Sequence, residues 1–336
     1  MKIAVVGIGY WGPNLVRNFL NNGRVHKVYC CDQDKTRLDL IRKQFPIVEV
    51  VSDYNEVLQN NSIDAVVLAT PVSTHFPLAK KALEAGKHVF VEKPITASSR
   101  EAEQLIEIAK RKKLILMVDH IFIFNGAVAK IHDIIDSGEI GKILYFDAVR
   151  INLGLFQHDV NVLWDLAIHD LSIMNHLLDE KPKAVSAVGI NHFNTIEDMS
   201  YLTLFFESNC IAHLHVNWLA PVKIRRILIG GTKKMIVYDE METVEKIRVY
   251  DKGVEIKTKE GIYKTLIQYR TGDMYAPSFD NTEALTLITQ EFIRRIHDQE
   301  SIDCCDGSEG LCIVQILEAA EKSIKNKGKI IELNCR

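Results

Sequence analysis

The fold is decided at the start of the chain by the stretch KIAVVGIGYWG, residues 2–12. A run of small and β-branched apolar residues, 2–6, leads directly into three glycines. Gly7 permits a tight turn, Gly9 lets a pyrophosphate approach the backbone, and Gly12 lets the following helix pack on the strand. The first N–H groups of that helix can then receive a phosphate. The stretch predicts a phosphate-binding turn between a strand and a helix, although an ordinary glycine-rich turn has the same pattern.

An acidic residue strengthens the dinucleotide interpretation. Asp32 stands 20 residues after Gly12, at the end of the second predicted strand. A carboxylate at this position bonds the hydroxyls of an adenosine ribose in dinucleotide-binding folds. Because the carboxylate would repel a 2′-phosphate, NAD is favoured over NADP. Lys35 and Arg37 lie close enough in sequence to leave NADP open as the less favoured cofactor.

Up to residue 120, short apolar runs alternate with amphipathic segments at helical spacing. This alternation is typical of βαβ units and of a doubly wound parallel sheet. The strands are continuous apolar runs, as at residues 65–69, because both faces of such a sheet are covered. The predicted strands are 2–6, 27–31, 48–51, 65–69, 88–91 and 114–118. We therefore expect residues 1–120 to form a dinucleotide-binding domain.

Beyond residue 120 the pattern changes. A helix at 127–137 is followed by strand-like segments, several of which alternate in polarity as antiparallel strands do. Gly230 and Gly231 indicate a hairpin between two of these strands, and residues 251–263 are charged and loop-like. Helices at 282–297 and 308–325 finish the chain. We expect residues 121–336 to form a second domain.

Composition excludes several classes of partner. The 336 residues include 41 Lys and Arg against 44 Asp and Glu, a net charge of −3, so no basic surplus exists for a nucleic acid or a membrane surface. The apolar runs are far shorter than the about 20 residues of a membrane span. No signal-peptide pattern begins the chain, and the seven cysteines contain no CxxC pair. We expect a cytoplasmic protein with a small-molecule partner and no metal.

Two motifs stand at predicted strand ends of the first domain. Thr70 and Pro71 end the fourth strand and His75 follows in the next helix, where a doubly wound fold binds its ligand; His75 could equally be a surface histidine. Glu92 and Lys93 precede a proline at the end of the fifth strand. Charges at the end of a buried strand are costly without partners, and the proline fixes the bend that aims the lysine. A solvated strand end is the alternative.

Asp165 and His169 form the second candidate cluster. They stand four residues apart on an amphipathic segment and so share one face of a helix. A carboxylate and an imidazole together can remove the hydroxyl proton during an alcohol oxidation. They could also be a structural ion pair or two of several metal ligands, but no third ligand stands at a recognisable spacing.

Together, the glycine loop, Thr70-Pro71 with His75, Glu92-Lys93-Pro94, and Asp165 with His169 resemble the Gfo/Idh/MocA family of nicotinamide-dependent sugar and polyol oxidoreductases. The resemblance covers essentially the whole chain. It implies an α/β protein with an N-terminal Rossmann domain, a doubly wound parallel sheet, and a C-terminal α+β domain with an open, largely antiparallel sheet. The implied cofactor contacts are Gly7, Gly9, Tyr10, Trp11, Gly12, Asp32, Thr70, Pro71, His75, Glu92 and Lys93.

The resemblance also implies catalytic roles. Lys93 would orient the reacting hydroxyl and stabilise the developing alkoxide, and the bond between Lys93 and Pro94 is often cis in this family. Asp165 would position the substrate or that lysine. His169 would be the general acid and base.

A narrower resemblance concerns the substrate. Segments 150–157, 161–165 and 169–172 are similar to a branch of the family that acts on nucleotide-linked amino sugars. Its best-understood type oxidises the 3-hydroxyl of UDP-N-acetylglucosamine or its uronic acid to a 3-keto sugar, which an aminotransferase can then use. The implied substrate contacts are Lys93, Asn125, Arg150, Asn152, Asn161, Asp165, His169 and Arg225. Arg225 and its neighbours Lys223 and Arg226 could meet a diphosphate, or could be surface charges on an edge strand.

The sequence departs from that branch in two places. Asp119 stands where Gly is usual, and Phe124-Asn125-Gly126 stands where Tyr-Asn-Pro is usual. Asn125 is retained as an expected contact, whereas the tyrosine hydroxyl is lost.

Three other interpretations stay open. The substrate could be a free polyol such as inositol, or the chain could reduce a ketosugar. In a different class, a non-catalytic NAD-binding sensor would keep the glycine loop and Asp32 but need no proton-transfer residues. The alternating strands of the second domain leave one sheet face, with Trp218, that is costly to expose. We therefore expect a homodimer or a homotetramer.

Overall fold

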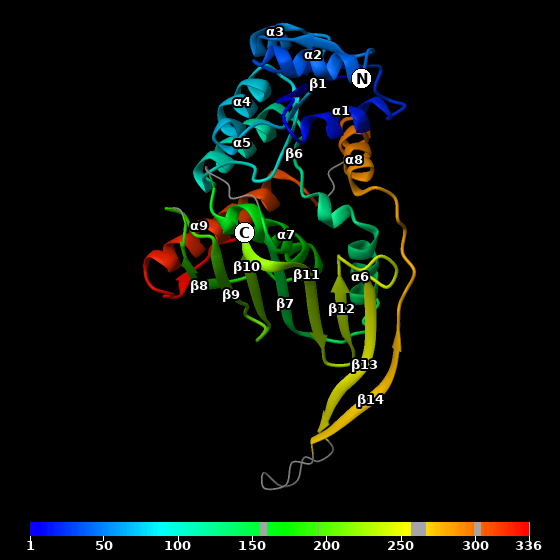
Figure 1. Ribbon diagram of the computed structural model, residues 1–336, viewed down its shortest axis with the longest axis vertical. Coiled ribbons are helices and arrows are strands. Elements are labelled where there is room, and N and C mark those ends of the chain that lie inside the picture. Colours follow the sequence, from blue (N-terminus) through cyan, green and yellow to red (C-terminus); the bar gives the residue numbers. More distant parts are fainter. Residues whose placement is uncertain (155–159, 194, 257–266, 299–303, 336) are drawn as a thin grey trace. The chain divides into compact units, whose positions relative to one another are not determined.

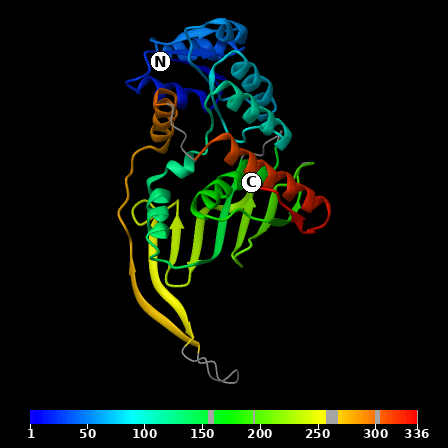
Figure 2. The same cartoon turned by 180° about the vertical axis from the view of Figure 1, so that it is seen from behind.

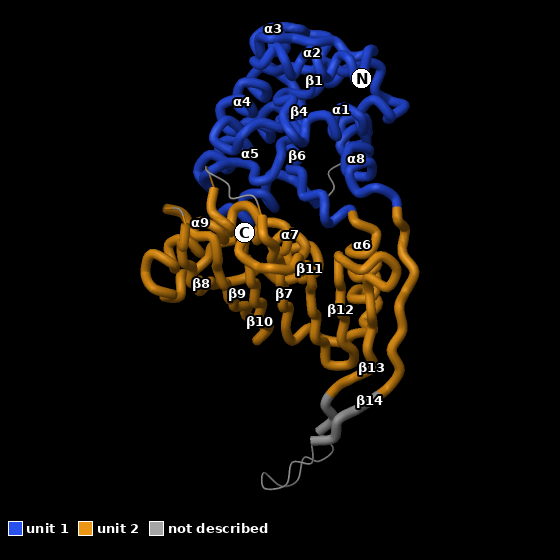
Figure 3. The backbone as a smooth tube through the Cα atoms, in the orientation of Figure 1, with its two compact units in different colours: residues 1–124, 282–315 blue, residues 125–281, 316–336 orange. Residues whose placement is uncertain are grey.

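The computed structural model describes residues 1–336 except 155–159, 194, 257–266, 299–303 and 336. The chain forms two compact units, which Figure 3 distinguishes by colour. Unit 1 comprises Met1–Phe124 and Thr282–Gln315, and unit 2 comprises Asn125–Asn281 and Ile316–Arg336. The boundary expected at 120/121 differs from this division, because residues 282–315 return to the first unit.

Unit 1 is built on a six-stranded sheet with the order β3-β2-β1-β4-β5-β6. Every pair of neighbouring strands is parallel, which confirms the predicted doubly wound sheet. The strands are β1 (Lys2–Val6), β2 (Lys27–Cys31), β3 (Glu49–Val51), β4 (Ala65–Leu68), β5 (His88–Val91) and β6 (Leu116–Val118). The strand order reverses between β1 and β4, where doubly wound folds bind ligands at the carboxyl ends of the strands.

Helices connect these strands (Figure 1). They are α1 (Gly12–Leu20), α2 (Lys35–Gln44), α3 (Tyr54–Gln59), α4 (Val72–Glu84) and α5 (Ser99–Lys112), followed by a 3₁₀ turn at Ile121–Phe124. Late in the sequence, α8 (Ala284–Asp298) joins the same unit, and α9 (Gly307–Lys325) begins in it.

Aromatic packing explains why α8 belongs to unit 1. The rings of Phe292 on α8 and Phe90 on β5 lie 5.4 Å apart between centroids, and Phe19 on α1 lies 6.3 Å from each. All three side chains are fully buried. Arg17 on α1 also donates to both carboxylate oxygens of Glu283. Burial of this aromatic cluster fixes a helix that a boundary drawn along the sequence assigns to the other domain.

Unit 2 is built on a nine-stranded sheet with the order β14-β13-β12-β11-β7-β10-β9-β8-β15. Only β7 and β10 pair in parallel, so the sheet is largely antiparallel, as expected. The strands are β7 (Ile143–Leu153), β8 (Ala184–Ile190), β9 (Met199–Phe205), β10 (Ile211–Asn217), β11 (Leu219–Gly231), β12 (Met235–Asp239), β13 (Ile247–Ile256), β14 (Ile267–Tyr275) and β15 (Ile331–Glu332). Its helices are α6 (Gly126–Asp136), a π-helical turn at Leu163–Ala167, α7 (Ile168–Leu177) and the rest of α9.

The end of the sheet differs from the sequence-based expectation. The hairpin indicated by Gly230 and Gly231 joins β11 to β12. In contrast, residues 251–256, expected as loop, continue β13, which pairs with β14. Figures 1 and 2 show β13 and β14 as a two-stranded ribbon that extends beyond the other strands of the sheet. The rest of the expected loop, 257–263, lies outside the described residues.

Three further findings concern the whole described chain. No disulfide joins any of the seven cysteines within this part of the chain. Among the described residues, no group of three or more His, Cys, Asp or Glu side chains could hold a metal ion. None of the helices in the described ranges has the length and apolar character needed to cross a membrane.

Candidate active site

The glycine loop has the geometry that a bound pyrophosphate requires. Gly7 has a φ of +92°, and a Cβ there would lie 2.5 Å from the carbonyl oxygen of Ala69. A Cβ on Gly12 would lie 2.3 Å from the carbonyl oxygen of Gly7, so neither position accepts a side chain. By contrast, a Cβ on Gly9 would lie 3.8 Å from its nearest neighbour, Nη1 of Arg37. The loop is closed toward the sheet and open at Gly9, which fits a phosphate approaching the backbone.

Helix α1 begins at this loop without a side-chain cap. Its N-cap residue, Trp11, makes no capping hydrogen bond. The first N–H groups of a helix have no partner within the helix, and they attract an anion. Tyr10, in the same loop, is 95% exposed. The residues present therefore fit a dinucleotide phosphate.

Asp32 connects the loop to the end of β2. Its Oδ2 accepts a hydrogen bond from the backbone N–H of Ile8 at 2.7 Å, and its Oδ1 accepts one from Asp34 at 2.9 Å. The guanidinium of Arg37 lies 3.6 Å from Oδ2 and is about half exposed. Each carboxylate oxygen has a second lone pair, so Asp32 can anchor the loop and still accept ribose hydroxyls.

His75 joins two strand ends within the core. Its Nδ1 lies 2.8 Å from the carbonyl oxygen of Pro94 and its Nε2 lies 2.8 Å from that of Thr70. The side chain is 1% exposed, and burial lowers its pKa. His75 was expected to contact the cofactor, whereas in the structure both ring nitrogens face backbone carbonyls. It holds the turn after β4 against the turn after β5.

The turn after β5 carries the candidate lysine. The peptide bond between Lys93 and Pro94 is cis, as the family resemblance implied. Glu92, just before the lysine, is partly buried and lies beside the buried Asp119, which follows β6. Lys93 is partly buried and lies close enough to influence both carboxyl groups.

In unit 2, Asp165 and His169 lie where a π-helical turn becomes α7. Single π-helical turns within helices are frequent at functional sites. The indole Nε1–H of Trp218 donates to Asp165 Oδ2 at 3.1 Å. Trp218 is 1% exposed, so the expectation that it forms part of an uncovered sheet face is wrong. Instead it helps to hold Asp165, a role that no motif around Trp218 predicts.

Arg150, expected to contact the substrate, lies in the core of unit 2. It is 2% exposed, and its guanidinium donates to both carboxylate oxygens of Asp170 at 2.8–3.1 Å and to Glu240 at 3.2 Å. Burial raises the pKa of Asp170, and the adjacent Arg150 opposes that shift. The network fixes Asp170 directly after His169. A buried partner for Arg150 could not be identified from sequence spacing.

Arg225 belongs to the same network. It donates to Glu240, its side chain is 25% exposed, and its Nε finds no hydrogen-bond partner within the described residues. Arg226 donates to Asp239 through two nitrogens. Of these two arginines, Arg225 therefore keeps an unused donor.

The three candidate asparagines differ in how far they are engaged. Asn161 is 5% exposed, accepts from the N–H groups of Leu163 and Trp164, and donates to Glu197 and Glu321. It caps the π-helical turn. Asn125 caps α6 through the N–H of Ala127, and Asn152 is partly buried on β7. Residues 155–157 of the substrate-related segment lie outside the described residues.

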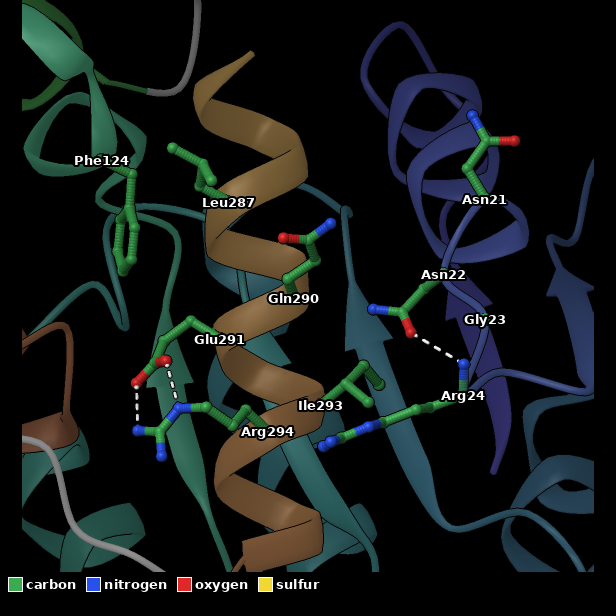
Figure 4. A pocket seen from close by; sticks show the side chains of 10 residues that line it. All are labelled: Asn21, Asn22, Gly23, Arg24, Phe124, Leu287, Gln290, Glu291, Ile293 and Arg294. Carbon is green, nitrogen blue, oxygen red and sulfur yellow. Dashed lines mark hydrogen bonds and ion pairs between the residues drawn. The ribbon is translucent and has the colours of Figure 1, made fainter. Parts of the chain in front are cut away.

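A hollow of about 560 Å³ in unit 1 lies between the turn after α1 and helix α8 (Figure 4). Its polar lining includes Asn22, Arg24 and Arg294, and Arg294 pairs with Glu291. None of its lining residues is a predicted site residue.

A doubly wound parallel sheet, a glycine loop open at Gly9 and a carboxylate at the end of β2 are the features of a dinucleotide-dependent enzyme class. Residues 1–120 match the family model described as "Oxidoreductase family, NAD-binding Rossmann fold", and residues 128–237 match the "GFO/IDH/MocA C-terminal domain". The chain belongs to the Gfo/Idh/MocA family of oxidoreductases, and its first domain is an NAD-binding Rossmann domain.

Several characterised proteins are similar to this chain. The scyllo-inositol 2-dehydrogenase (NAD(+)) of Bacillus subtilis is 33% identical over 195 residues, which are 56% of this chain and 57% of the relative. The UDP-N-acetylglucosamine 3-dehydrogenase of Acidithiobacillus ferrooxidans is 27% identical over 261 residues, 75% of this chain and 78% of the relative. The solved structure of GenD2 from gentamicin A biosynthesis, in complex with NAD, has a TM-score of 0.83 at 20% identity, covering 99% of this chain and 96% of that one. This likeness shows the shared fold.

Proposed function

We propose that this oxidoreductase uses NAD to oxidise a secondary alcohol of a nucleotide sugar. The preferred substrate is UDP-N-acetylglucosamine or its uronic acid, oxidised at the 3-hydroxyl to a 3-keto sugar. The observation that carries the proposal is the extent of the match to the UDP-N-acetylglucosamine 3-dehydrogenase, 75% of this chain, against 56% for the inositol dehydrogenase.

The chain's own residues would move the hydroxyl proton. Lys93 would donate a hydrogen bond to the reacting oxygen and stabilise the negative charge that develops there. His169 would accept the hydroxyl proton as general base. Asp165, which the indole of Trp218 holds, would orient the substrate or the lysine. When bound, NAD would supply the hydride acceptor, so that one alcohol would yield one ketone, one reduced cofactor and one proton.

The glycine loop and Asp32 would hold the cofactor. The N-terminus of α1 would receive the pyrophosphate, since Gly9 leaves its approach open and the helix has no side-chain cap. Asp32 would accept the ribose hydroxyls. Tyr10 and Trp11, the other loop side chains, would flank the dinucleotide.

Arg225 is the basic side chain that best suits a diphosphate in unit 2. Its side chain is partly exposed, and its Nε, which is buried, has no hydrogen-bond partner within the described residues. Asn125 and Asn152 are the remaining candidates for the sugar, because Arg150 and Asn161 are buried and hydrogen-bonded within unit 2.

A second candidate substrate is a free polyol such as inositol, or the corresponding keto compound in the reducing direction. The higher identity to the scyllo-inositol dehydrogenase, 33%, favours it. A free polyol has no diphosphate, so Arg225 would then have no role in affinity.

The test compares substrates on one preparation. Purified protein with NAD is mixed with UDP-N-acetylglucosamine, its uronic acid or an inositol, and formation of the reduced cofactor is followed by absorbance. We expect the highest kcat/KM with a UDP sugar, and a loss of that preference in Arg225→Met. Turnover of inositols alone would favour the polyol alternative, and turnover of neither class would reject the proposal.

Assembly with a second copy of this chain forms part of the proposal. By strand register, Val188, Tyr201, Ile211 and Leu228 share one face of the unit 2 sheet. All four side chains are at least 36% exposed. An apolar face of this kind favours a homodimer or homotetramer, and a monomer mass in light scattering would contradict it.

The 3-keto sugar formed in the proposed reaction would be the substrate of a downstream aminotransferase.

A further inference from the structure

Two carboxyl groups lie side by side at the carboxyl edge of the unit 1 sheet. Val91 of β5 and Val118 of β6 are register partners, so Glu92 and Asp119 are the next residues on adjacent strands. The backbone N–H of Glu92 donates to Leu68 at 2.9 Å, and that of Asp119 donates to Val91 at 2.8 Å. Since neighbouring strands are about 4.8 Å apart, the two side chains start close together.

Both carboxyl groups have oxygens that are shielded from water. Asp119 is 2% exposed, and Glu92 Oε1 and both carboxyl oxygens of Asp119 are buried. None of these three oxygens has a hydrogen-bond partner within the described residues. The two carboxyl groups are nevertheless close enough to interact with each other, and Asp119 is close enough to interact with Trp11. A buried oxygen in this state calls for a physical explanation.

Charge repulsion supplies that explanation. Burial, and then the neighbouring Asp119, raise the pKa of Glu92 well above its ordinary value. Burial raises the pKa of Asp119 to about 6. Two carboxylates this close and this dry do not both ionise at neutral pH, and they titrate as a pair.

The surrounding groups leave Lys93 as the one cation that faces the pair among the described residues. The pKa of His120 falls to about 3, through burial and then through Lys93, so its ring is neutral. The Cys305 thiol beside Asp119 has a raised pKa, first from burial, and is also neutral. Lys93 acts on both carboxyl groups and opposes the rise in their pKa values.

We propose that Glu92 and Asp119 share a single proton and so present one negative charge to the Lys93 ammonium, which makes Asp119 a positioning residue for that lysine. The inference rests on the role given to Lys93 in the proposed function. When the shared proton is lost at higher pH, two negative charges face the ammonium and draw it away from the substrate hydroxyl. Turnover therefore falls on the alkaline side as the pair ionises.

Infrared difference spectroscopy of the cofactor-free protein tests the shared proton without any substrate. The wild-type protein should show the carbonyl band of a protonated carboxylic acid at neutral pH, and this band should disappear as the pH rises. The pH at which the band disappears should fall in Asp119→Asn and also in Glu92→Gln, but stay unchanged in the control Asp39→Asn, an exposed position on α2. No such band in the wild type, or a band that disappears at the wild-type pH in both Asp119→Asn and Glu92→Gln, would overturn the proposal.

The pH profile of kcat/KM tests the positioning role. Asp119→Asn leaves only the Glu92 carboxyl group beside Lys93, so a second negative charge cannot develop there, and the alkaline fall should move by at least about one pH unit or vanish. Thermal unfolding and NAD affinity check that each variant is folded and binds cofactor. An alkaline limb that is unchanged in both Asp119→Asn and Glu92→Gln would contradict the role. Failure of the substrate assignment would leave the infrared result intact.

Discussion

Two buried clusters of charge, one in each unit, solve the same physical problem differently. In unit 2, Arg150 is matched by Asp170 and Glu240, and the guanidinium donates to both carboxylates. In unit 1, three buried carboxyl oxygens of Glu92 and Asp119 lie near Lys93 and lack hydrogen-bond partners within the described residues.

The difference indicates that the Arg150 cluster stabilises the fold and that the cluster around Lys93 serves the reaction. Buried charges are costly unless they are paired and hydrogen-bonded. The Arg150 cluster meets that condition, so it can fix the position of α7 but has little left to offer a ligand. The carboxyl oxygens of Glu92 and Asp119 do not meet it within the described residues, and titratable groups with perturbed pKa values in a dinucleotide-binding fold indicate a site kept for reaction.

The largest expected effect tests whether the Arg150 cluster is structural. Arg150→Met leaves Asp170 buried without its partner, and breaking such a pair costs about 3–5 kcal/mol of unfolding free energy. Chemical denaturation measures it, with Arg100→Met on the exposed surface of α5 as the matched control. A loss no larger than that of the control would show that the network contributes nothing to stability.

A change at His169 tests the reacting side of the comparison. His169→Ala should lower kcat by about 100-fold or more, since general base catalysis typically contributes that much, while the unfolding midpoint changes little. Steady-state kinetics provide the measurement. His297→Ala, at a mostly exposed position on α8, should leave kcat unchanged. Equal kcat values for the two variants would remove His169 from the mechanism.

A change at Asp32 separates cofactor affinity from turnover. Asp32→Ala removes the acceptor of the Ile8 N–H and of the ribose hydroxyls. Hydrogen bonds to charged groups contribute about 1.5–3 kcal/mol, so NAD should bind at least about 10-fold more weakly. Calorimetric titration with NAD measures this, and Asp53→Ala, which only caps α3, is the control. Unaltered NAD affinity would mean that Asp32 serves the loop alone.

The smallest effect is expected at Trp218. Trp218→Phe keeps most of the buried ring but removes the Nε1–H donor to Asp165. A net hydrogen bond contributes about 0.5–1.5 kcal/mol, so kcat should fall by about 3- to 10-fold. Kinetics of this variant should match those of Asp165→Asn in the sign of the change in KM. An increase in kcat would mean that the indole restrains Asp165 unproductively.

The sequence predicted much of the fold because its signals are local. The apolar runs and the glycine loop predicted where the unit 1 strands lie along the chain. The structure places β1 to β6 within a few residues of the expected ranges. The return of α8 to unit 1 could not be predicted, because the packing of Phe292 on Phe19 and Phe90 joins residues more than 200 positions apart.

Site residues were predictable where a motif sets the backbone, as at Gly7 and Gly12. They were less so where burial decides the role. Arg150 and His75 have side chains that suit ligands, yet the structure turns them to Asp170 and to two backbone carbonyls. Asp119 shows the reverse, since only the register of β6 on β5 brings it against Glu92.

Lys93→Met decides whether the cluster of Glu92, Asp119 and Lys93 exists for chemistry. Turnover of a UDP sugar and the dissociation constant for NAD are measured on the same preparation, with Lys43→Met on α2 as the control. The account predicts a fall in kcat of about 100-fold or more, with NAD affinity within about threefold of wild type, because the lysine acts on the developing alkoxide. Undiminished turnover, or loss of NAD binding in proportion to turnover, would contradict it.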